Sequence, residues 1–309
     1  MHKIKGVYSA SLTPVNKQFS INKSLLLSHS RWLLDQGVDG LGVFGTTGEA
    51  NSFSIDEKIN ALEFLIQNNI RSDQMIPGTG QCSIYDTVRF TKKCSELNVK
   101  AVLILPPFFY KNVSDQGVID YFRRLVEGVA DNNLKYILYN IPQNTGVPIN
   151  FNIIENLIKL YPNNIVGMKD SSGSLDNMLK VTKLFNEFSL FSGSDSLALK
   201  VCQRGGAGAI TATSNISGKL LSFIVNNYKK ESSIANFQEM QFLQVKIRET
   251  LFVHEPVSAL KALMSVKENN VDWNRINPPL NIITNPENNK IVIKLIKLLK
   301  EMDVLLSSV

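Results

Sequence analysis

Cysteine, histidine and long apolar runs are all scarce in this sequence. Its 309 residues include only three cysteines, Cys82, Cys94 and Cys202, and no two of them form a Cys-x-x-Cys pair. Because they are odd in number and far apart, they suit neither a disulfide framework nor a zinc site. The three histidines add little material for a metal centre. We therefore expect a reducing, cytoplasmic location, and neither a metal ion nor a cofactor.

The sequence also lacks the segments that direct a chain to a membrane or to nucleic acid. No uninterrupted apolar run approaches the roughly 20 residues of a membrane span, and the first six residues lack the apolar centre of a signal peptide. Lysine and arginine outnumber the acidic residues by 33 to 27, but they are scattered along the chain. We expect neither a membrane nor a nucleic acid as a partner.

Short β-rich apolar runs alternate with longer helical patterns along most of the chain. The expected strands are Gly6–Leu12, Gly40–Phe44, Met75–Gly78, Ala101–Leu105, Tyr136–Tyr139, Ile165–Lys169, Leu190–Ser192 and Ala209–Thr213. The expected helices between them are Asn22–Gln36, Ile55–Asn68, Ile84–Leu97, Val118–Ala130, Ile153–Leu160, Met178–Phe188 and Ser196–Arg204. Eight strand–helix units in succession predict an α/β fold of the (β/α)8 TIM barrel type.

A doubly wound open sheet is the competing fold. Residues 40–45 have the G-x-G-x-x-G spacing that would suit it, but they lie inside an expected strand and not at a turn into a helix. The strand signal stops after about residue 229, and helical patterns follow at Phe237–Leu251, Val257–Val266 and Asn289–Leu306. We therefore expect a catalytic barrel over residues 1–229 and a small C-terminal helical extension over residues 230–309.

A lysine stands where one of the expected strands ends. Lys169 closes the apolar stretch 165–168 and precedes Asp170. Burial of a lysine disfavours its charged form, and a neutral amine can form a Schiff base with a ketone. Taken alone, the segment favours the simpler interpretation, a lysine that reaches solvent. The chemical interpretation therefore depends on what other polar groups accompany Lys169.

Polar groups follow several of the other expected strands, and in a barrel the carboxyl ends of the strands carry the chemistry. Thr46 and Thr47, between two glycines, offer N–H groups and hydroxyls to a small carboxylate, although a tight turn is an equal interpretation. Glu49 is either a substrate ligand or an acid that favours a helix start. Tyr139 suits a proton shuttle beside an amine or a core position.

A lysine, a tyrosine and a carboxylate-binding turn together suit one chemistry. Schiff-base formation on a 2-oxo acid needs an amine, an anchor for the carboxylate, and a group that moves protons on and off the carbinolamine. The protonated imine then accepts electrons from a C–C bond that is made or broken. This chemistry needs no metal.

Three motifs resemble those of the dihydrodipicolinate synthase / N-acetylneuraminate lyase family. They are Gly45-Thr46-Thr47-Gly48-Glu49, Tyr139-Asn140-Ile141-Pro142 and Gly167-Met168-Lys169-Asp170. Their order and spacing match over nearly the whole chain. The resemblance implies a (β/α)8 barrel with a C-terminal helical extension and a homotetramer built as a dimer of dimers. It also implies a lyase or aldolase that acts on pyruvate and a small aldehyde or oxo acid.

The resemblance also implies roles for individual residues. Lys169 would form the imine with pyruvate, and Tyr139 would relay protons, with Thr47 linking it to the substrate. Thr46 and Thr47 would hold the pyruvate carboxylate through their backbone N–H groups, and the backbone of Ile210 would contact the pyruvate. The candidates for holding the other half of the substrate are Ser171, Asn144 and Asp195. Turn and cap chemistry is an equal interpretation of these last three.

Two departures from the synthase pattern bear on the substrate. Synthases of this family carry an arginine two residues after the proline of the tyrosine motif, where it holds a carboxylate. Asn144 stands there in this sequence, and an amide cannot replace a bidentate guanidinium. The same enzymes place a second tyrosine, from a neighbouring subunit, where this sequence has Phe109, unless Tyr110 takes its place.

These residues favour a class I pyruvate-dependent lyase that cleaves or forms a 4-hydroxy-2-oxo acid. The segments around Asn144 and Ser171 are also similar to those of 4-hydroxy-2-oxoglutarate aldolases. Three alternatives stay open: 4-hydroxy-tetrahydrodipicolinate synthase itself, a dehydratase of 2-oxo-3-deoxy sugar acids, and a non-catalytic barrel that binds an oxo acid.

Overall fold

The computed structural model describes residues 3–308, which fall into two compact units. The first unit comprises residues 3–6 and 71–210, and the second comprises residues 7–70 and 211–308. The predicted boundary between residues 229 and 230 concerns a different division of the chain and stays a prediction.

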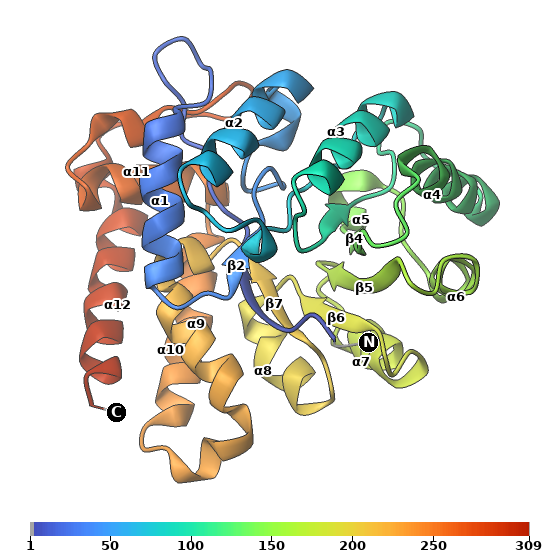
Figure 1. Cartoon of the computed structure of the whole chain (residues 1–309). Helices are drawn as coiled ribbons and strands as arrows, with labels where there is room; N and C mark the ends of the chain where they lie inside the picture. The colour runs from blue at the N-terminus through green and yellow to red at the C-terminus, as the bar shows by residue number, and fades with distance from the viewer. Residues whose placement is uncertain (1–2, 309) are drawn as a thin grey trace. The chain divides into compact units, whose positions relative to one another are not determined.

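Five parallel strands form the sheet of the first unit, in the order β7-β6-β5-β4-β3 (Figure 1). They are β3 (Val102–Ile104), β4 (Tyr136–Asn140), β5 (Ile165–Asp170), β6 (Ser189–Ser192) and β7 (Gly208–Thr211), whose last residue belongs to the second unit. Every residue of these strands except Val166 is buried. This burial is typical of a parallel sheet covered on both faces.

Helices alternate with these strands along the chain. They are η2 (Ser72–Gln74), α3 (Ile84–Glu96), α4 (Asp115–Val129), α5 (Pro142–Thr145), α6 (Phe151–Leu160), α7 (Leu175–Leu184) and α8 (Asp195–Gln203). Helix α4 packs against both α3 and α6. Gly128 makes the α3–α4 contact close, because a Cβ there would lie 3.0 Å from a methyl group of Val88. The α/β alternation expected from the sequence is confirmed in this unit.

The second unit has a short parallel strand pair and most of the long helices. Its strands are β1 (Gly6–Ser9, of which Gly6 belongs to the first unit) and β2 (Gly40–Leu41), with Tyr8 paired with Gly40. Its helices are α1 (Lys23–Asp35), η1 (Ala50–Ser52), α2 (Ile55–Gln67), α9 (Ser214–Asn227), η3 (Tyr228–Ser233), α10 (Phe237–Leu251), α11 (Pro256–Lys267), η4 (Val271–Asn274), η5 (Pro286–Asn288) and α12 (Lys290–Leu306). Helices α9, α10 and α12 pack together (Figure 1).

Residues 75–78 are not the strand that the sequence predicts. Gly78 forms an isolated parallel bridge with Leu103, Leu103 N–H donates to the Pro77 carbonyl, and Thr79 N–H donates to the Leu103 carbonyl. The segment lies beside β3 as a parallel strand would, but Pro77 has no N–H with which to continue the ladder of hydrogen bonds. The prediction of a regular strand at Met75–Gly78 is therefore wrong.

Helix α9 is the largest element that the sequence patterns do not predict. Ten of its residues are buried, including the consecutive run from Ser214 to Gly218. A helix buried on most of its surface lacks the apolar stripe that gives a helical period. Helix α7 also ends four residues before its predicted end at Phe188. No helix within residues 3–308 has the combination of length and apolar character needed to cross a membrane.

Candidate active site

Lys169 and Tyr139 face each other near the carboxyl ends of two adjacent strands. They are register partners on β5 and β4, so their side chains leave the sheet on the same face. The Lys169 Nζ lies 4.1 Å from the centre of the Tyr139 ring. Lys169 is 5% exposed and Tyr139 is 3% exposed. The amine is therefore withdrawn from bulk water beside a phenol, which is the pairing that the sequence motifs predict.

A glycine two residues before Lys169 lets β5 and β6 lie close together. Gly167 is the register partner of Ser189, and a Cβ on Gly167 would lie 2.5 Å from the Ser189 carbonyl oxygen. Gly167 and Lys169 are on the same face of β5. Strands β5 and β6 can therefore approach each other on the face that carries the amine only because this position has no side chain.

A network of hydrogen bonds around Asp170 and Asn140, called the Asn140–Asp170 clamp below, joins the ends of β4 and β5. Asp170 is fully buried, and its carboxylate accepts hydrogen bonds from Asn140 Nδ2 (3.1 Å), the Ser172 N–H (2.8 Å) and Asn177 Nδ2 (2.6 Å). Asn140 Oδ1 also accepts the N–H of Ile149 at 3.0 Å. Since Asn140 and Asp170 follow Tyr139 and Lys169 directly, these hydrogen bonds hold the backbone that carries both of those side chains. Asn140 and Asp170 belong to two of the sequence motifs, but the sequence gives no sign of this role.

The loop after β5 contains the predicted substrate ligand Ser171. Its N–H donates to the Asn140 carbonyl at 2.8 Å, and its carbonyl accepts Gln143 Nε2 at 2.8 Å. The Ser171 hydroxyl lies against Gly193, where any Cβ would collide with it. Asn144, one residue after Gln143 in α5, is exposed. The structure thus brings Ser171 and α5 together at the carboxyl ends of β4 and β5.

The remaining predicted ligands of the first unit are buried. Ile210 lies in β7, two strands away from β5. Asp195 is the first residue of α8 and is fully buried. Its burial favours a structural role over direct contact with a solvent-borne substrate.

The Thr-Thr turn lies in the second unit, between β2 and η1. The Glu49 N–H donates to the Thr46 carbonyl at 3.1 Å, and the Ala50 N–H donates to the Gly45 carbonyl at 3.2 Å. Gly48 is required by close approach, because a Cβ there would lie 2.9 Å from the Ser11 carbonyl oxygen. Thr47 is 8% exposed. The segment is therefore a tight turn, and this geometry is compatible with anion binding by its N–H groups.

A buried ion pair anchors this turn. Glu49 and Lys261 of α11 form an ion pair in which the side chains are 0% and 1% exposed, respectively. Glu49 Oε2 also accepts the Asn277 N–H at 2.9 Å, and Lys261 Nζ donates to the Arg275 carbonyl at 3.0 Å. Burial lowers the pKa of Lys261, and the adjacent Glu49 carboxylate opposes that effect. Glu49 therefore serves as an internal anchor, which neither of its sequence interpretations included.

The family assignment agrees with this arrangement. The model of the dihydrodipicolinate synthetase family matches residues 3–298. The chain belongs to this family. A curated relative, the 4-hydroxy-tetrahydrodipicolinate synthase of Methanococcoides burtonii, is 29% identical over 295 residues, which cover 95% of this chain and 97% of the relative.

Two solved structures share the fold of this family member. A catalytic lysine mutant of the Ruminococcus gnavus sialic acid aldolase matches with a TM-score of 0.86 at 19% identity, over 96% of each chain. YagE of E. coli K12, a prophage protein of the dihydrodipicolinic acid synthase family solved in complex with pyruvate, matches with a TM-score of 0.86 at 21% identity. That match covers 95% of this chain and 98% of YagE. The predicted family and enzyme class, a lyase that works through a lysine Schiff base, are confirmed.

An exposed aromatic pair lies in the loop between β3 and α4. Phe109 and Tyr110 are 73% and 75% exposed, and their ring centres lie 5.3 Å apart. Lys111 fastens the loop to α5, since its Nζ donates to the carbonyls of Phe108 and, at 2.7 Å, Thr145. The Lys111 stem lies against Gly146, where a Cβ would be 2.8 Å from it. Lys111 lies outside the three sequence motifs, so no pattern in the sequence points to these contacts.

Proposed function

We propose that this enzyme is a class I aldolase, which joins pyruvate to a small aldehyde or cleaves the 4-hydroxy-2-oxo acid product. The observation that carries the proposal is the buried Lys169 amine, 4.1 Å from the centre of the Tyr139 ring at the carboxyl ends of adjacent strands. Parallel α/β sheets bind their ligands at that end of the strands.

Lys169 is the nucleophile in the proposed reaction. Its neutral amine attacks C2 of the 2-oxo acid, and the carbinolamine loses water to give an iminium ion. Tyr139 transfers the protons that these steps require. In the cleavage direction the C4 hydroxyl loses its proton, the C3–C4 bond breaks, and the electron pair moves into the iminium group. The aldehyde leaves, the enamine takes a proton at C3, and hydrolysis of the imine releases pyruvate.

The other predicted site residues keep their roles as part of this proposal. Thr46 and Thr47 would bind the pyruvate carboxylate through their N–H groups, with Thr47 linking Tyr139 to the substrate and the Ile210 backbone contacting the pyruvate. Ser171 and Asn144, near the same strand ends as Lys169, would hold the second half of the substrate. The burial of Asp195 gives it the weakest support among the substrate ligands.

We also propose the finer architecture that the family resemblance implies. The strands would belong to a (β/α)8 barrel over residues 1–229, followed by the helical extension over residues 230–309. The enzyme would be a cytoplasmic homotetramer. The exposed Phe109–Tyr110 pair supports a subunit contact, because exposed neighbouring aromatic side chains are enriched at interfaces.

The second candidate is 4-hydroxy-tetrahydrodipicolinate synthase, the activity named for the Methanococcoides burtonii relative. The residues at α5 weaken this candidate. An arginine is absent there, Gln143 is engaged by the Ser171 carbonyl, and Asn144 cannot form a bidentate pair with a carboxylate. Substrate trials with pyruvate plus either glyoxylate or aspartate semialdehyde separate the two candidates, with turnover expected for the first pair.

Borohydride reduction in the presence of pyruvate tests the mechanism directly. The expected result is one pyruvate fixed per chain, with peptide mapping placing it on Lys169. An unmodified Lys169 under saturating pyruvate would overturn the proposed mechanism, whichever aldehyde the enzyme uses.

A further inference from the structure

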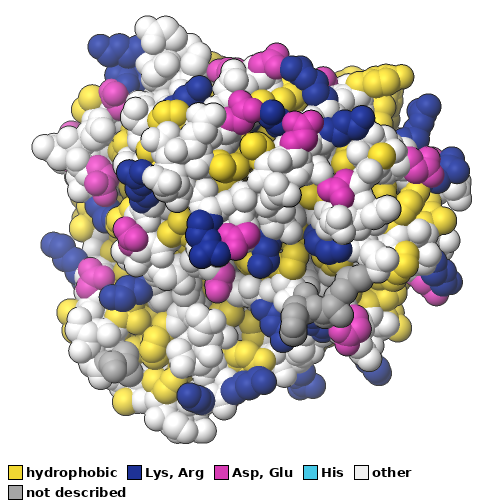
Figure 2. Space-filling view, in the orientation of Figure 1, with side chains coloured by type: hydrophobic (Ala, Val, Ile, Leu, Met, Phe, Trp, Pro, Cys, Tyr) yellow, Lys and Arg dark blue, Asp and Glu magenta, His cyan; other side chains and the backbone are white. Residues whose placement is uncertain are grey.

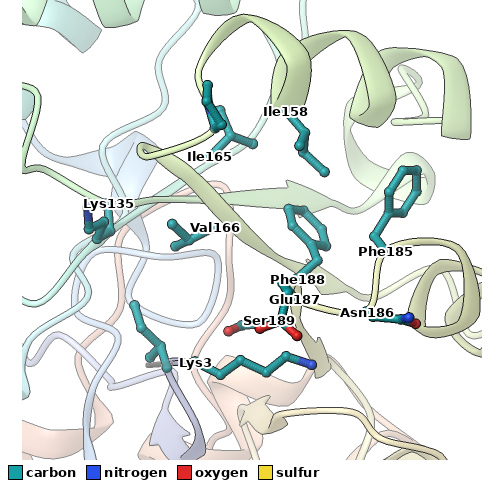
Figure 3. Close-up of a pocket in the computed structure, with 12 residues that line it drawn as sticks. Lys3, Lys135, Ile158, Ile165, Val166, Phe185, Asn186, Glu187, Phe188 and Ser189 are labelled. Atoms are coloured by element: carbon teal, nitrogen blue, oxygen red, sulfur yellow. The ribbon is translucent and has the colours of Figure 1, made fainter. Parts of the chain in front are cut away.

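A pocket of about 470 Å³ lies at the amino ends of β5 and β6 (Figure 3). Ile165 and Val166, the first residues of β5, and Ser189, the first residue of β6, line it. Lys169 is four residues further along β5, which corresponds to about 13 Å of strand. The pocket is therefore separate from the Schiff-base site, and every residue that lines it belongs to the first unit.

The wall of this pocket is mostly apolar. Its apolar residues are Ile4, Ile158, Pro162, Ile165, Val166, Phe185 and Phe188. In Figure 3, Lys3 lies on the opposite side of the pocket from Ile158 and Ile165, and Val166 and Phe188 lie between them. The volume falls within the range of small-molecule sites, which combine an apolar wall with a few polar groups.

The polar part of the lining consists of the charged residues Lys3, Lys135 and Glu187 together with Asn186 and Ser189. Lys135 donates to the Asn163 carbonyl at 2.7 Å, so part of its hydrogen-bonding capacity is used. The Lys3 side chain is extended in Figure 3, and a lysine can pack its stem on apolar surface while its amine stays available to an anion. Two cations against one carboxylate give the pocket a net positive lining.

An unsatisfied hydroxyl lies beneath the surface of this pocket. Ser189 is 1% exposed, and its Oγ has no hydrogen-bond partner among residues 3–308. Buried polar atoms nearly always have a partner, and each exception requires an explanation. This Oγ is itself shielded from solvent, so it lies beneath the pocket surface and a bound molecule does not reach it.

We propose that the pocket binds a small amphipathic carboxylic acid, with a branched or aromatic body against the apolar wall and its carboxylate beside Lys3. The apolar wall supplies most of the binding free energy, because that free energy scales with the apolar area removed from water. The cation at the rim selects an acid over a neutral molecule of the same shape. This site does not depend on the proposed aldolase activity.

Three probes with the same phenylpropyl body separate the contributions to binding. They are 3-phenylpropionate, L-phenylalanine and 3-phenylpropan-1-ol, and their dissociation constants are measured by calorimetry on the full chain. We expect 3-phenylpropionate to bind about fivefold more tightly than the alcohol, the upper range for a solvent-accessible ion pair. L-Phenylalanine tests whether Glu187 accepts an ammonium group, and binding equal to or tighter than that of the acid would identify amino acids as the source of the carboxylate.

Two pairs of variants locate the site. Ile158→Trp fills the pocket from α6 and should weaken 3-phenylpropionate binding at least about tenfold by steric exclusion. Leu160→Trp is the control, which should keep the binding of the parent, because Leu160 is an exposed residue of the same helix that does not line the pocket. Lys3→Gln should abolish the preference for the acid over the alcohol, whereas Lys5→Gln, exposed and outside the pocket, should preserve it.

The proposal is overturned if none of the three probes binds, or if Ile158→Trp and Leu160→Trp bind 3-phenylpropionate equally. If Ile158→Trp does not fold, the acid preference of the Lys3→Gln and Lys5→Gln pair decides. Borohydride trapping of pyruvate is a separate measurement, so failure at Lys169 and failure at this pocket are distinguishable.

Discussion

Lys169 in the first unit and Lys261 in the second are both almost completely buried, yet their surroundings differ. Lys261 forms an ion pair with the buried Glu49 carboxylate and donates to a backbone carbonyl. Lys169 faces the ring of Tyr139, and within residues 3–308 we find no carboxylate in ion-pair contact with it. Burial alone therefore does not make a lysine a nucleophile, since an amine that is already engaged by a buried carboxylate and a backbone carbonyl serves as a structural contact.

Burial of an amine costs free energy, and the two lysines differ in what that burial serves. At Lys261 the ion pair joins the Thr-Thr turn to α11, so the charge serves structure. At Lys169 the amine stands at a strand end, where Gly167 lets the strands approach and the Asn140–Asp170 clamp holds the backbone. The following variants test whether these two roles can be separated, in order of decreasing expected effect.

Removal of the Lys169 amine should give the largest loss. Lys169→Ala should lower kcat by more than about 10⁴-fold, because removal of a covalent nucleophile eliminates the reaction path. The measurement is steady-state turnover of the identified substrate, together with pyruvate trapping by mass. Trapped pyruvate on Lys261, or trapping that survives Lys169→Ala, would contradict the contrast between the two lysines.

Removal of the Lys261 amine should affect stability. Lys261→Met leaves the Glu49 carboxylate buried without its partner, which should lower the free energy of unfolding by about 3–5 kcal/mol. Urea denaturation followed by circular dichroism measures this. The double variant Glu49→Gln with Lys261→Met should recover part of the loss, since it removes the unpaired charge. If Lys261→Met were as stable as the parent, the Glu49–Lys261 ion pair would contribute nothing to the free energy of unfolding.

The Tyr139 hydroxyl should matter for proton transfer more than for packing. Tyr139→Phe keeps the ring beside Lys169 and should lower kcat by about 10²–10³-fold. Tyr136→Phe is the matched control on the same strand, because the Tyr136 hydroxyl is buried and has no hydrogen-bond partner within residues 3–308. Equal kcat values for the two variants would exclude Tyr139 as the proton shuttle.

A buried histidine gives the second unit a pH dependence that the lysine pair does not explain. Burial lowers the pKa of His29 to about 4, although a hydrogen bond to Asn215 opposes the shift. As the pH falls from about 6.5 to about 4, the unfolded chain therefore gains a proton that the folded chain excludes, which costs about 3 kcal/mol of stability. Denaturation profiles of the parent and His29→Gln between pH 7 and pH 4 measure this, and parallel profiles would contradict it.

The sequence predicted the elements and the proximity of Lys169 and Tyr139 better than it predicted the contacts that support them. The strand–helix alternation and the pairing of Lys169 with Tyr139 were readable, because each depends on local pattern or on strand-end position. The clamp at Asp170, the Glu49–Lys261 pair and the Lys111 contacts could not be predicted. Each joins residues that are distant in sequence, or uses a side chain whose partners only the folded chain supplies.

The sequence by itself determined the family and pointed to Lys169 as the amine to test, because three motifs in order carry information that does not depend on coordinates. Only the tertiary structure decided which buried lysine is paired with a carboxylate, that Pro77 ends a predicted strand, and that a second pocket opens at the amino ends of β5 and β6. The physical reason is that pairing, burial and cavity volume are properties of side chains brought together across the fold, whereas motifs and periodicity are properties of neighbours along the chain.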